Sequence, residues 1–457
     1  MSRRERLVVI GGVAAGLSAA SYAKRRRPDM EVTVFERSPH ASYGSCGLPY
    51  LIEGLVEDPG ELIALPLEDL RQKRGLDVRV LHEVTHIDTK EKSVIVSDIV
   101  AGKELRAPYD SLVISTGASP VAPPLPGIDM EGVFVLRTLE DGVRLEDYMK
   151  SRRPKKTAVI GGGYIGLEMA EAFSIRGCEV TVIERLNAVL PGFDKEIAAS
   201  VERKLLEKGV RLMLSTGVLA FERTGTAIRV IAENEDVEAD LVLLAAGIRP
   251  NTALAEKAGV GLGTTGAINV NRRMETNVPG IYACGDCAES YHRIVERNVW
   301  IPLGDTANKE GRIAGANIAG EDAVFPGIIG TAATKVFDLE IARTGLGEDE
   351  SHAEGFDASA ALVDSYTRAH YYPGRKQIKI KLISEKGTKR LLGAQAVGGE
   401  GVAKRIDVFA AAIWAGMTLD DVAWLDLTYV PPVSTVWDPV LLAAQVASKA
   451  AGATQGG

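Results

Sequence analysis

The sequence contains few cysteines. Four in 457 residues, scattered along the chain, do not make a disulfide framework. A reducing cytoplasm is therefore the expected location. The basic residues at the start and the apolar residues after them imitate a secretory signal, but that apolar stretch divides into a strand, a glycine turn, a helix and a second strand. A signal peptide consists of a basic region, an apolar region and a cleavage site, and does not contain such a unit.

Several other features are missing. No apolar run approaches the roughly 18–20 residues that span a bilayer without a charge or a glycine, so no membrane span is expected. The net charge of −8 leaves no general basic surface for nucleic acid or an anionic membrane. The six histidines do not cluster at metal-ligand spacings, so no metal is expected. Aromatic residues make up only 5%, whereas glycine occurs 48 times, which suits an α/β fold with many tight turns.

The start of the chain predicts a dinucleotide-binding unit. A strand at Leu7–Ile10 leads into the glycine turn GGVAAG, then into a helix and a second strand that ends at Glu36. Gly11 would make the sharp turn, and Gly16 would let helix and strand pack closely. The free N–H groups at the helix start would face a pyrophosphate, and Glu36 would accept hydrogen bonds from a ribose. Val13 departs from the pattern, because glycine is usual there.

A second unit repeats this layout further along the chain. The segment KTAVIGGGYIGLE carries all three glycines, Gly161, Gly163 and Gly166, and a helix and the strand EVTVIER follow it. Two such units imply two dinucleotides. Glu184, at the end of the second strand, favours the unphosphorylated ribose of NADH, and Arg185 beside it leaves NADPH open.

Three further strands are expected to border the nucleotide sites. LVISTG and LVLLAAG each end in a small residue plus glycine, at Thr116-Gly117 and Ala246-Gly247. A backbone could pass close to a cofactor at such points. The third strand, IYACGD, ends at Asp286, which could hold a sugar or ribityl hydroxyl. A helix is expected to follow it with its N-terminus facing phosphate.

The chain resembles, over nearly its whole length, the FAD-dependent pyridine nucleotide–disulfide oxidoreductases. The resemblance rests on the two glycine turns, the two strand ends and the YACGD segment, which occur in the family's order. It implies an α/β fold with two Rossmann-like domains and a C-terminal α+β domain that pairs two subunits. The implied domains are an FAD-binding domain from residues 1–118 and 252–325, an NAD(P)H-binding domain from 119–251 and a dimerisation domain from 326–457.

The resemblance also assigns cofactor contacts. FAD would lie on the first glycine turn, with Asp286 on its ribityl chain, and NADH or NADPH would lie on the second. The residues expected to contact a nucleotide are Gly11, Gly12, Val13, Ala14, Ala15, Gly16, Glu36, Arg37, Thr116, Gly117, Gly161, Gly163, Tyr164, Ile165, Gly166, Glu184, Gly247, Gly285 and Asp286.

A single cysteine, Cys46 in the segment SYGSCGLPY, indicates which branch of this family the chain resembles. The glutathione-reductase type needs a second cysteine with four residues between the two, but those positions hold Ala41 and Leu51. SCGLPY instead resembles the coenzyme A-disulfide reductases, polysulfide reductases and NADH oxidases. Because Pro49 suits a first helical turn, Cys46 is expected to be a thiolate at a helix start, able to face the flavin.

The C-terminal half resembles the coenzyme A-disulfide reductases. The matching segments are HYYPG from His370, LGAQ from Leu392, KRID from Lys404 and LTYVPP from Leu427, followed by Asp438-Pro439. In that group the tyrosine before the Pro-Pro pair reaches the active-site sulfur of the partner subunit. The resemblance therefore implies a homodimer and assigns this role to Tyr429. The HYYPG segment contributes a second tyrosine, either Tyr371 or Tyr372.

The implied function is an FAD-dependent NAD(P)H reductase of coenzyme A disulfide, or of coenzyme A persulfide or polysulfide. Hydride would pass from NAD(P)H to FAD, and the electrons would pass on to a mixed disulfide between Cys46 and coenzyme A. The freed Cys46 thiolate would attack the next substrate sulfur. Tyr429 would donate a hydrogen bond to the leaving thiolate.

Coenzyme A carries phosphates, so its site needs cations. Arg25 and Arg26, at the end of the first helix, and Arg74, in a predicted helical segment, could supply them. Ser42 and Ser45 could contact the pantetheine arm. A basic helix end also complements the helix dipole without any ligand, so the two interpretations of the arginines stay open.

Two other functions also stay open. The first is an NADH oxidase, in which O₂ oxidises the flavin and Cys46 cycles through a sulfenic acid. NADH oxidases and peroxidases that resemble this chain carry a histidine inside the first glycine turn, where this chain has Ala14. The second is a non-enzymatic flavoprotein redox sensor. The CGDC segment at Cys284–Cys287 has the spacing of a thioredoxin dithiol, but its place in the flavin-binding segment favours a structural role.

Overall fold

The computed structural model describes residues 4–452, which divide into two compact units. Each unit is assembled from segments that are separate in the sequence. Unit 1 consists of residues up to 121 with 137–146 and 248–328, and unit 2 consists of 122–136, 147–247 and 329 onward. Helix α4 (Leu139–Arg152) contributes residues to both units. The division into three functional domains stays a prediction.

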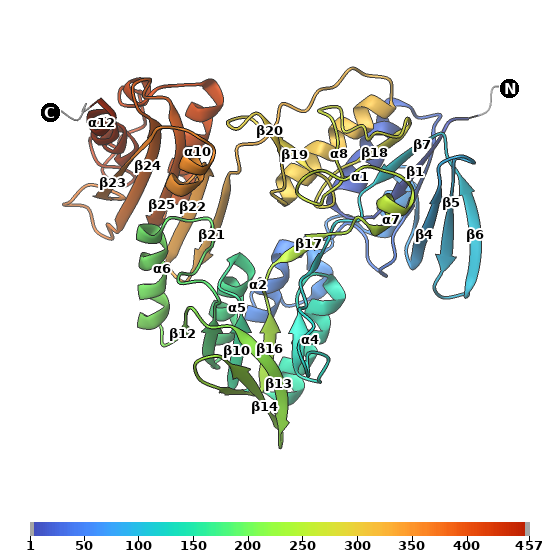
Figure 1. Ribbon diagram of the computed structural model, residues 1–457, viewed down its shortest axis with the longest axis horizontal. Coiled ribbons are helices and arrows are strands. Elements are labelled where there is room, and N and C mark those ends of the chain that lie inside the picture. The colour runs from blue at the N-terminus through green and yellow to red at the C-terminus, as the bar shows by residue number, and fades with distance from the viewer. Residues whose placement is uncertain (1–3, 453–457) are drawn as a thin grey trace. The chain divides into compact units, whose positions relative to one another are not determined.

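Unit 1 is built on a parallel five-stranded sheet in the order β18-β7-β1-β2-β3. Its strands are β1 (Arg6–Ile10), β2 (Glu31–Phe35), β3 (Asp77–Arg79), β7 (Ser111–Ile114) and β18 (Ile281–Ala283). Aliphatic runs form these strands, and central residues such as Val9 and Val113 are fully buried, as is typical of parallel sheets. Helices α1 (Ala14–Arg26) and α8 (Gly304–Ile318) pack side by side (Figure 1).

Smaller elements complete unit 1. They are the antiparallel meander β4 (His82–Asp88), β5 (Ser93–Asp98) and β6 (Lys103–Pro108); the ribbon β8 (Ala118–Pro120) with β17 (Ile248–Pro250); the hairpin β19 (Ser290–His292) with β20 (Arg297–Val299); the helices α2 (Leu48–Glu53), α3 (Leu67–Gln72) and α7 (Ala253–Lys257); and the 3₁₀ turns Ser45–Gly47 and Pro59–Leu62.

The prediction of a helix directly after Asp286 was wrong. The chain makes a turn there, in which the N–H of Ala288 donates to the carbonyl of Gly285 at 2.8 Å, and then enters the β19–β20 hairpin. The next helix, α8, begins only at Gly304. The position of Gly285-Asp286 is therefore fixed by a turn.

Unit 2 contains a second parallel five-stranded sheet, in the order β12-β11-β10-β16-β9. Its strands are β9 (Val133–Val135), β10 (Lys156–Ile160), β11 (Glu179–Ile183), β12 (Arg211–Met213) and β16 (Leu241–Leu244), with helices α5 (Tyr164–Ile175) and α6 (Lys195–Glu207) and the meander β13 (Val218–Thr224), β14 (Ala227–Ala232) and β15 (Val237–Ala239). Counted from the strand before each glycine turn, the order β12-β11-β10-β16 repeats the order β3-β2-β1-β7 of unit 1. The fifth strand differs, because β18 follows the other strands in the sequence whereas β9 precedes them. The predicted pair of Rossmann-like sheets is confirmed.

The C-terminal part of unit 2 is an antiparallel sheet in the order β21-β22-β25-β24-β23. Its elements are β21 (Ala332–Val336), β22 (Leu339–Gly345), α9 (Glu348–Ala353), β23 (Ala358–Tyr366), β24 (Gln377–Glu385), β25 (Leu391–Gly398), α10 (Val402–Ala415), α11 (Leu419–Val422) and α12 (Pro439–Gly452). Strand β25 is buried at every residue, and α10 packs against it. The predicted α+β region is confirmed. None of the helices in residues 4–452 has the length and apolar character of a membrane span.

Candidate functional site

The first glycine turn joins β1 to α1 in a conformation that only glycine tolerates. Gly11 has a φ of +104°, and a Cβ there would lie 2.2 Å from the carbonyl oxygen of Ser115. A Cβ on Gly16 would lie 2.0 Å from the carbonyl oxygen of Gly11. Both substitutions would collide with backbone, so the turn needs these glycines for the close packing of helix on strand.

Glu36 is anchored directly behind this turn. Its carboxylate, which is 8% exposed, accepts hydrogen bonds from the N–H of Gly12 at 2.7 Å and from the N–H of Ser38 at 2.9 Å. Each carboxylate oxygen has further acceptor capacity. Glu36 is thus fixed at the end of β2, and its predicted contact with a ribose stays a prediction.

The second glycine turn repeats this geometry almost atom for atom. Gly161 has a φ of +112°, and a Cβ on Gly166 would again lie 2.0 Å from the preceding glycine carbonyl. Glu184 accepts from the N–H of Gly162 at 2.6 Å and from the N–H of Leu186 at 2.7 Å. Two unrelated glycine-rich turns would not be expected to share this set of contacts, so the chain contains two turns of one kind.

The two turns differ at their central position. A Cβ on Gly163 would meet nothing within 4 Å, which leaves the face of the second turn open. The first turn carries the Val13 side chain there. Neither α1 nor α5 has a side-chain cap at its N-terminus, so their first N–H groups are not occupied by capping side chains. Such N–H groups suit a pyrophosphate.

The strand ends predicted to border the sites lie at the carboxyl edges of the sheets. Thr116 donates its hydroxyl hydrogen to the carbonyl of Asn251 at 2.6 Å, and Gly117 has a φ of +67°. Gly247 has a φ of +103° with open space around it. Of the remaining predicted contacts, Ala14 and Ala15 begin α1, Tyr164 and Ile165 begin α5, and Arg37 is exposed beside Glu36.

Asp286 lies beside the first glycine turn, because a Cβ on Gly285 would lie 2.7 Å from the Cβ of Ala15. Its carboxylate pairs with Arg137 at 2.5 Å, and Arg137 also donates to the carbonyl of Ala118 at 3.2 Å. Sequence reasoning missed Arg137. It lies in LRT, which carries no motif signal, in a segment far from Asp286 along the chain.

Cys46 is the one exposed thiol of the four. It lies in the 3₁₀ turn Ser45–Gly47, directly before α2, and Pro49 occupies the first turn of that helix as expected. The N–H of Ser42 donates to the carbonyl of Gly12 at 2.9 Å, which ties this segment to the first glycine turn. Within unit 1, the accessible cysteine and the first predicted nucleotide turn are therefore one assembly.

The other cysteines are placed as structural residues. Cys284 and Cys287 are completely buried, and burial raises the pKa of the Cys287 thiol to about 11. Burial also raises the pKa of Cys178, whose thiol donates to the carbonyl of Pro154 at 3.3 Å. Because the thiolate is the reactive form, these three thiols are poor nucleophiles.

Two of the three predicted basic residues, Arg25 and Arg26, lie around Tyr22 on α1. The guanidinium groups of Arg25 and Arg26 lie 5.0 and 5.7 Å from the centre of the Tyr22 ring, and Arg26 pairs with Glu321. Tyr22 was not predicted, since a tyrosine on a helix gives no signal by itself. Arg74 is exposed but lies beyond α3, which ends at Gln72, so its predicted helical position was wrong.

The structure brings together two of the three predicted tyrosines. The neighbouring hydroxyl of Tyr371 raises the pKa of the Tyr429 hydroxyl. The ring of Tyr372 instead lies 5.9 Å from the guanidinium of Arg368. All three tyrosines are exposed. Between the two tyrosines that the sequence left open, Tyr371 is the one beside Tyr429.

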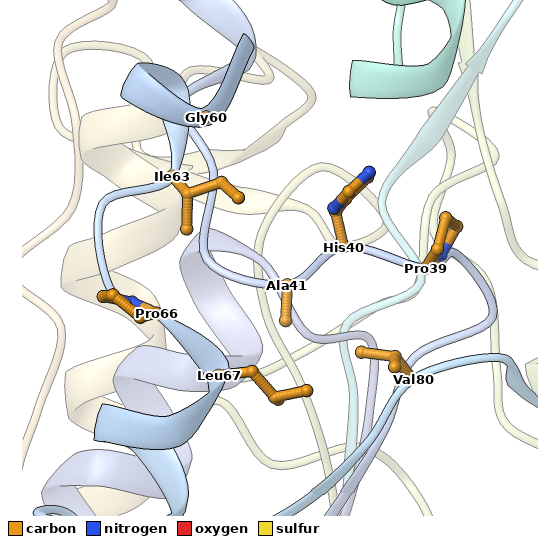
Figure 2. A pocket seen from close by; sticks show the side chains of 8 residues that line it. All are labelled: Pro39, His40, Ala41, Gly60, Ile63, Pro66, Leu67 and Val80. Atoms are coloured by element: carbon orange, nitrogen blue, oxygen red, sulfur yellow. The ribbon is translucent and has the colours of Figure 1, made fainter. Parts of the chain in front are cut away.

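A cavity of about 260 Å³ is lined in part by residues 39–41, which lead to Ser42. Figure 2 shows Leu67 and Val80 pointing toward one another across it, with Ala41 between them. Its lining is mainly apolar, with His40 at one side. None of the predicted site residues lines it.

The sequence matches one family along most of its length. Residues 5–311 match the pyridine nucleotide-disulphide oxidoreductases, and residues 331–439 match the dimerisation domain of the same family. The chain belongs to the pyridine nucleotide-disulphide oxidoreductases. The expected family is confirmed, and with it the assignment of the chain as an oxidoreductase.

Three similar proteins place the chain within this oxidoreductase family. The NAD(P)H sulfur oxidoreductase (CoA-dependent) of Pyrococcus abyssi is 44% identical over 97% of this chain and 98% of its own length. An NADH oxidase of Methanocaldococcus jannaschii is 38% identical over 97% of this chain and 99% of its own length. The solved structure of an NAD-dependent persulfide reductase from A. fulgidus is 44% identical, with a TM-score of 0.94 over 97% of this chain and 83% of that one.

Proposed function

We propose that this oxidoreductase uses NADH or NADPH to reduce coenzyme A disulfide, or coenzyme A persulfides and polysulfides, with FAD as its bound cofactor. The observation that carries the proposal is the assembly of the one exposed thiol, Cys46, with a glycine turn, in a chain that holds two such turns. The similarity to a CoA-dependent sulfur oxidoreductase and a persulfide reductase supports the choice of substrate.

The residues present fit two dinucleotides. The glycine turns leave space where a phosphate would approach, as the open face of Gly163 illustrates. Glu36 and Glu184 are held by backbone N–H groups at the ends of their strands, where each would accept ribose hydroxyls. We assign FAD to the turn in unit 1, with Asp286 and Arg137 beside it, and NAD(P)H to the turn in unit 2. When bound, FAD supplies two-electron chemistry between the nicotinamide nucleotide and sulfur.

Cys46 would perform the sulfur chemistry. Its thiolate attacks one sulfur of the substrate disulfide, a new S–S bond forms between Cys46 and coenzyme A, and the other half of the substrate leaves as a thiolate. A proton donor beside the leaving sulfur speeds this step. We assign that role to Tyr429 of the partner subunit, with Tyr371 as the neighbour whose hydroxyl influences that of Tyr429.

A homodimer follows from this assignment. The dimerisation-domain match and a group of exposed apolar side chains in the same region support it, among them Trp424 and Trp437 at 79% and 50% exposure. Large exposed aromatic residues of this kind mark interaction surfaces. We place the dimer in a reducing cytoplasm, because all four thiols are free.

Coenzyme A would be held by the basic face of α1. Arg25 and Arg26 around Tyr22 offer cations for its phosphates. Ser45, which is half-buried and next to Cys46, would contact the pantetheine arm, whereas Ser42 is buried at 9% exposure and is less available for that contact. Arg74 is exposed and would offer a third cation to the phosphates of coenzyme A.

An NADH oxidase is the second candidate, supported by the 38% identical relative of that name. In that case Cys46 would cycle through a sulfenic acid with O₂ as acceptor. A small side chain at Ala14 disfavours it, because no acid or base is supplied from the first turn.

The test is NADH oxidation by the holoprotein with coenzyme A disulfide, with polysulfide plus coenzyme A, and with O₂ alone. The proposal predicts fast turnover with a sulfur acceptor. Cys46→Ser should abolish that turnover while NADH still bleaches the flavin. Cys178→Ser, at a half-buried thiol, is the matched control and should keep full activity. Equal turnover with O₂ alone in the natural chain would favour the oxidase.

A further inference from the structure

Two loops of the C-terminal sheet carry the tyrosines. The first, residues 367–376, connects β23 to β24 and holds Tyr371. The second, residues 423–438, connects α11 to α12 and holds Tyr429. The loops touch directly, because the N–H of Ala369 donates to the carbonyl of Pro431 at 3.2 Å. A single weak backbone contact between two exposed loops would not by itself fix two tyrosine hydroxyls.

A buried arginine from α10 joins the same loops. Arg405, 8% exposed, donates from Nη2 to the carbonyl of Thr367 at 3.3 Å and to the carbonyl of Val433 at 3.2 Å. The first acceptor begins the Tyr371 loop, and the second lies four residues after Tyr429. One guanidinium therefore holds a point in each loop at once.

Asp438 fixes the orientation of this guanidinium. Its carboxylate, 9% exposed, accepts from Nε of Arg405 at 3.1 Å and from Nη2 at 2.9 Å. It also accepts from the hydroxyl of Ser434 at 2.6 Å and from the N–H of Val440 at 2.9 Å. The carboxylate thus has four donors, and the arginine is held in one plane.

We propose that Arg405 is a positioning residue of the sulfur-reducing site, which aligns Tyr371 with Tyr429 by bridging their loops through Thr367 and Val433. It touches neither tyrosine. The role rests on the proposed function, since it matters for turnover only if these tyrosines act on the leaving sulfur. The planar fork is essential, because a lysine would carry the same charge but could not reach two carbonyls and a carboxylate in fixed directions.

The test separates positioning from mere stability by a double-mutant cycle. Arg405→Lys and Tyr429→Phe are made singly and together, and turnover is measured with NADH and coenzyme A disulfide. A positioned acid contributes about 10²–10⁴-fold, so Arg405→Lys should lower kcat by roughly tenfold or more. Because both changes act through one hydroxyl, the double variant should be no slower than Tyr429→Phe alone. Losses that multiply would overturn the proposal.

Two controls test whether the loss of kcat in Arg405→Lys arises at the tyrosines. Lys404→Met changes the neighbouring residue, which is exposed and pairs with Asp407, and should leave kcat unchanged. The rate at which NADH reduces the flavin without an acceptor should be the same in Arg405→Lys and the natural chain. If Arg405→Lys fails to fold, Asp438→Asn replaces it. This variant weakens the same orientation and should show a smaller loss that also vanishes in the Tyr429→Phe background.

Amide hydrogen exchange measures the bridge between the two loops without any turnover, so it tests the role of Arg405 independently of the proposed function. If the natural chain turned over no sulfur acceptor, the proposed function would fail, but the bridge could still be measured. Arg405→Lys should then speed amide exchange in residues 367–376 and 429–438 together, while the middle of α10 stays protected. Unchanged exchange in either loop would refute the bridging role.

Discussion

Glu36 accepts a hydrogen bond from the backbone N–H of Gly12 at 2.7 Å, so the acidic residue at the end of β2 is held by the turn that would cradle phosphate. The pair Glu184 and Gly162 repeats the contact at 2.6 Å in unit 2. This correspondence is the structural basis for assigning two nucleotides to one chain.

Replacing the two glutamates should separate the two sites. Glu36→Gln should reduce flavin retention, and Glu184→Gln should raise the KM for NADH with flavin content intact. Hydrogen bonds to a charged group contribute about 1.5–3 kcal/mol, so affinity at each site should fall by roughly ten- to a hundredfold. Flavin absorbance after gel filtration and NADH kinetics would measure the effects. Loss of both nucleotides in either variant would contradict the assignment.

The glycines of the second turn should divide into packing and contact positions. Gly166→Ala would press a methyl group against the carbonyl of Gly161 and should destabilise the fold by about 1–3 kcal/mol, as overpacking does. Gly163→Ala meets no protein atom and should leave urea unfolding unchanged while raising the KM for NADH. If Gly163→Ala unfolded as easily as Gly166→Ala, the open face would not be a binding surface.

Thiol labelling should find one reactive cysteine. Under native conditions iodoacetamide should modify Cys46 first, because it is exposed, whereas Cys284 and Cys287 are fully buried with raised thiol pKa values. Peptide mapping after a short reaction would show the order. Early labelling within CGDC would mean that this segment is a working dithiol.

Glu310 should make stability depend on pH. It is fully buried beneath Gly285, and burial raises its pKa from an ordinary value of 4.5 to about 8. The folded chain therefore binds a proton that the unfolded chain has lost between these values. Its contribution to stability is complete below about pH 4.5 and is lost as the pH rises through about 8.

Glu310→Gln tests this contribution, because glutamine keeps an oxygen that can accept from the N–H of Gly285. Urea unfolding should show the variant gaining stability relative to the natural chain as the pH rises from about 5 to about 9. A constant difference between the two proteins over this range would show that Glu310 does not titrate on unfolding.

The sequence predicted correctly those parts of the candidate site that depend on the backbone conformation of neighbouring residues. The glycine turns, their strands and Pro49 follow from residue spacing, because each reflects a steric need of neighbouring residues. It was informative about Cys46 because one cysteine in a glycine and serine turn is unusual in a cysteine-poor chain. The helix expected after Asp286 failed because the residues that follow pair as a hairpin, a choice made by tertiary contacts.

Contacts between distant segments could not be predicted. Arg137 reaches Asp286 from 149 positions away, and no motif marks either partner for the other. Tyr371 is favoured over Tyr372 because it is the tyrosine that raises the pKa of Tyr429, and the sequence does not distinguish the two tyrosines. Arg405 lay in a recognised segment, KRID, but only its burial and its carbonyl partners give it a role.

The most direct test is the intact mass of the freshly purified chain, measured with flavin removed, before and after treatment with a reductant. The account predicts a loss equal to one coenzyme A, mapped to the peptide that contains Cys46. An unmodified Cys46, or one carrying a single oxygen atom, would contradict coenzyme A as its partner and would favour an NADH oxidase or direct polysulfide reduction.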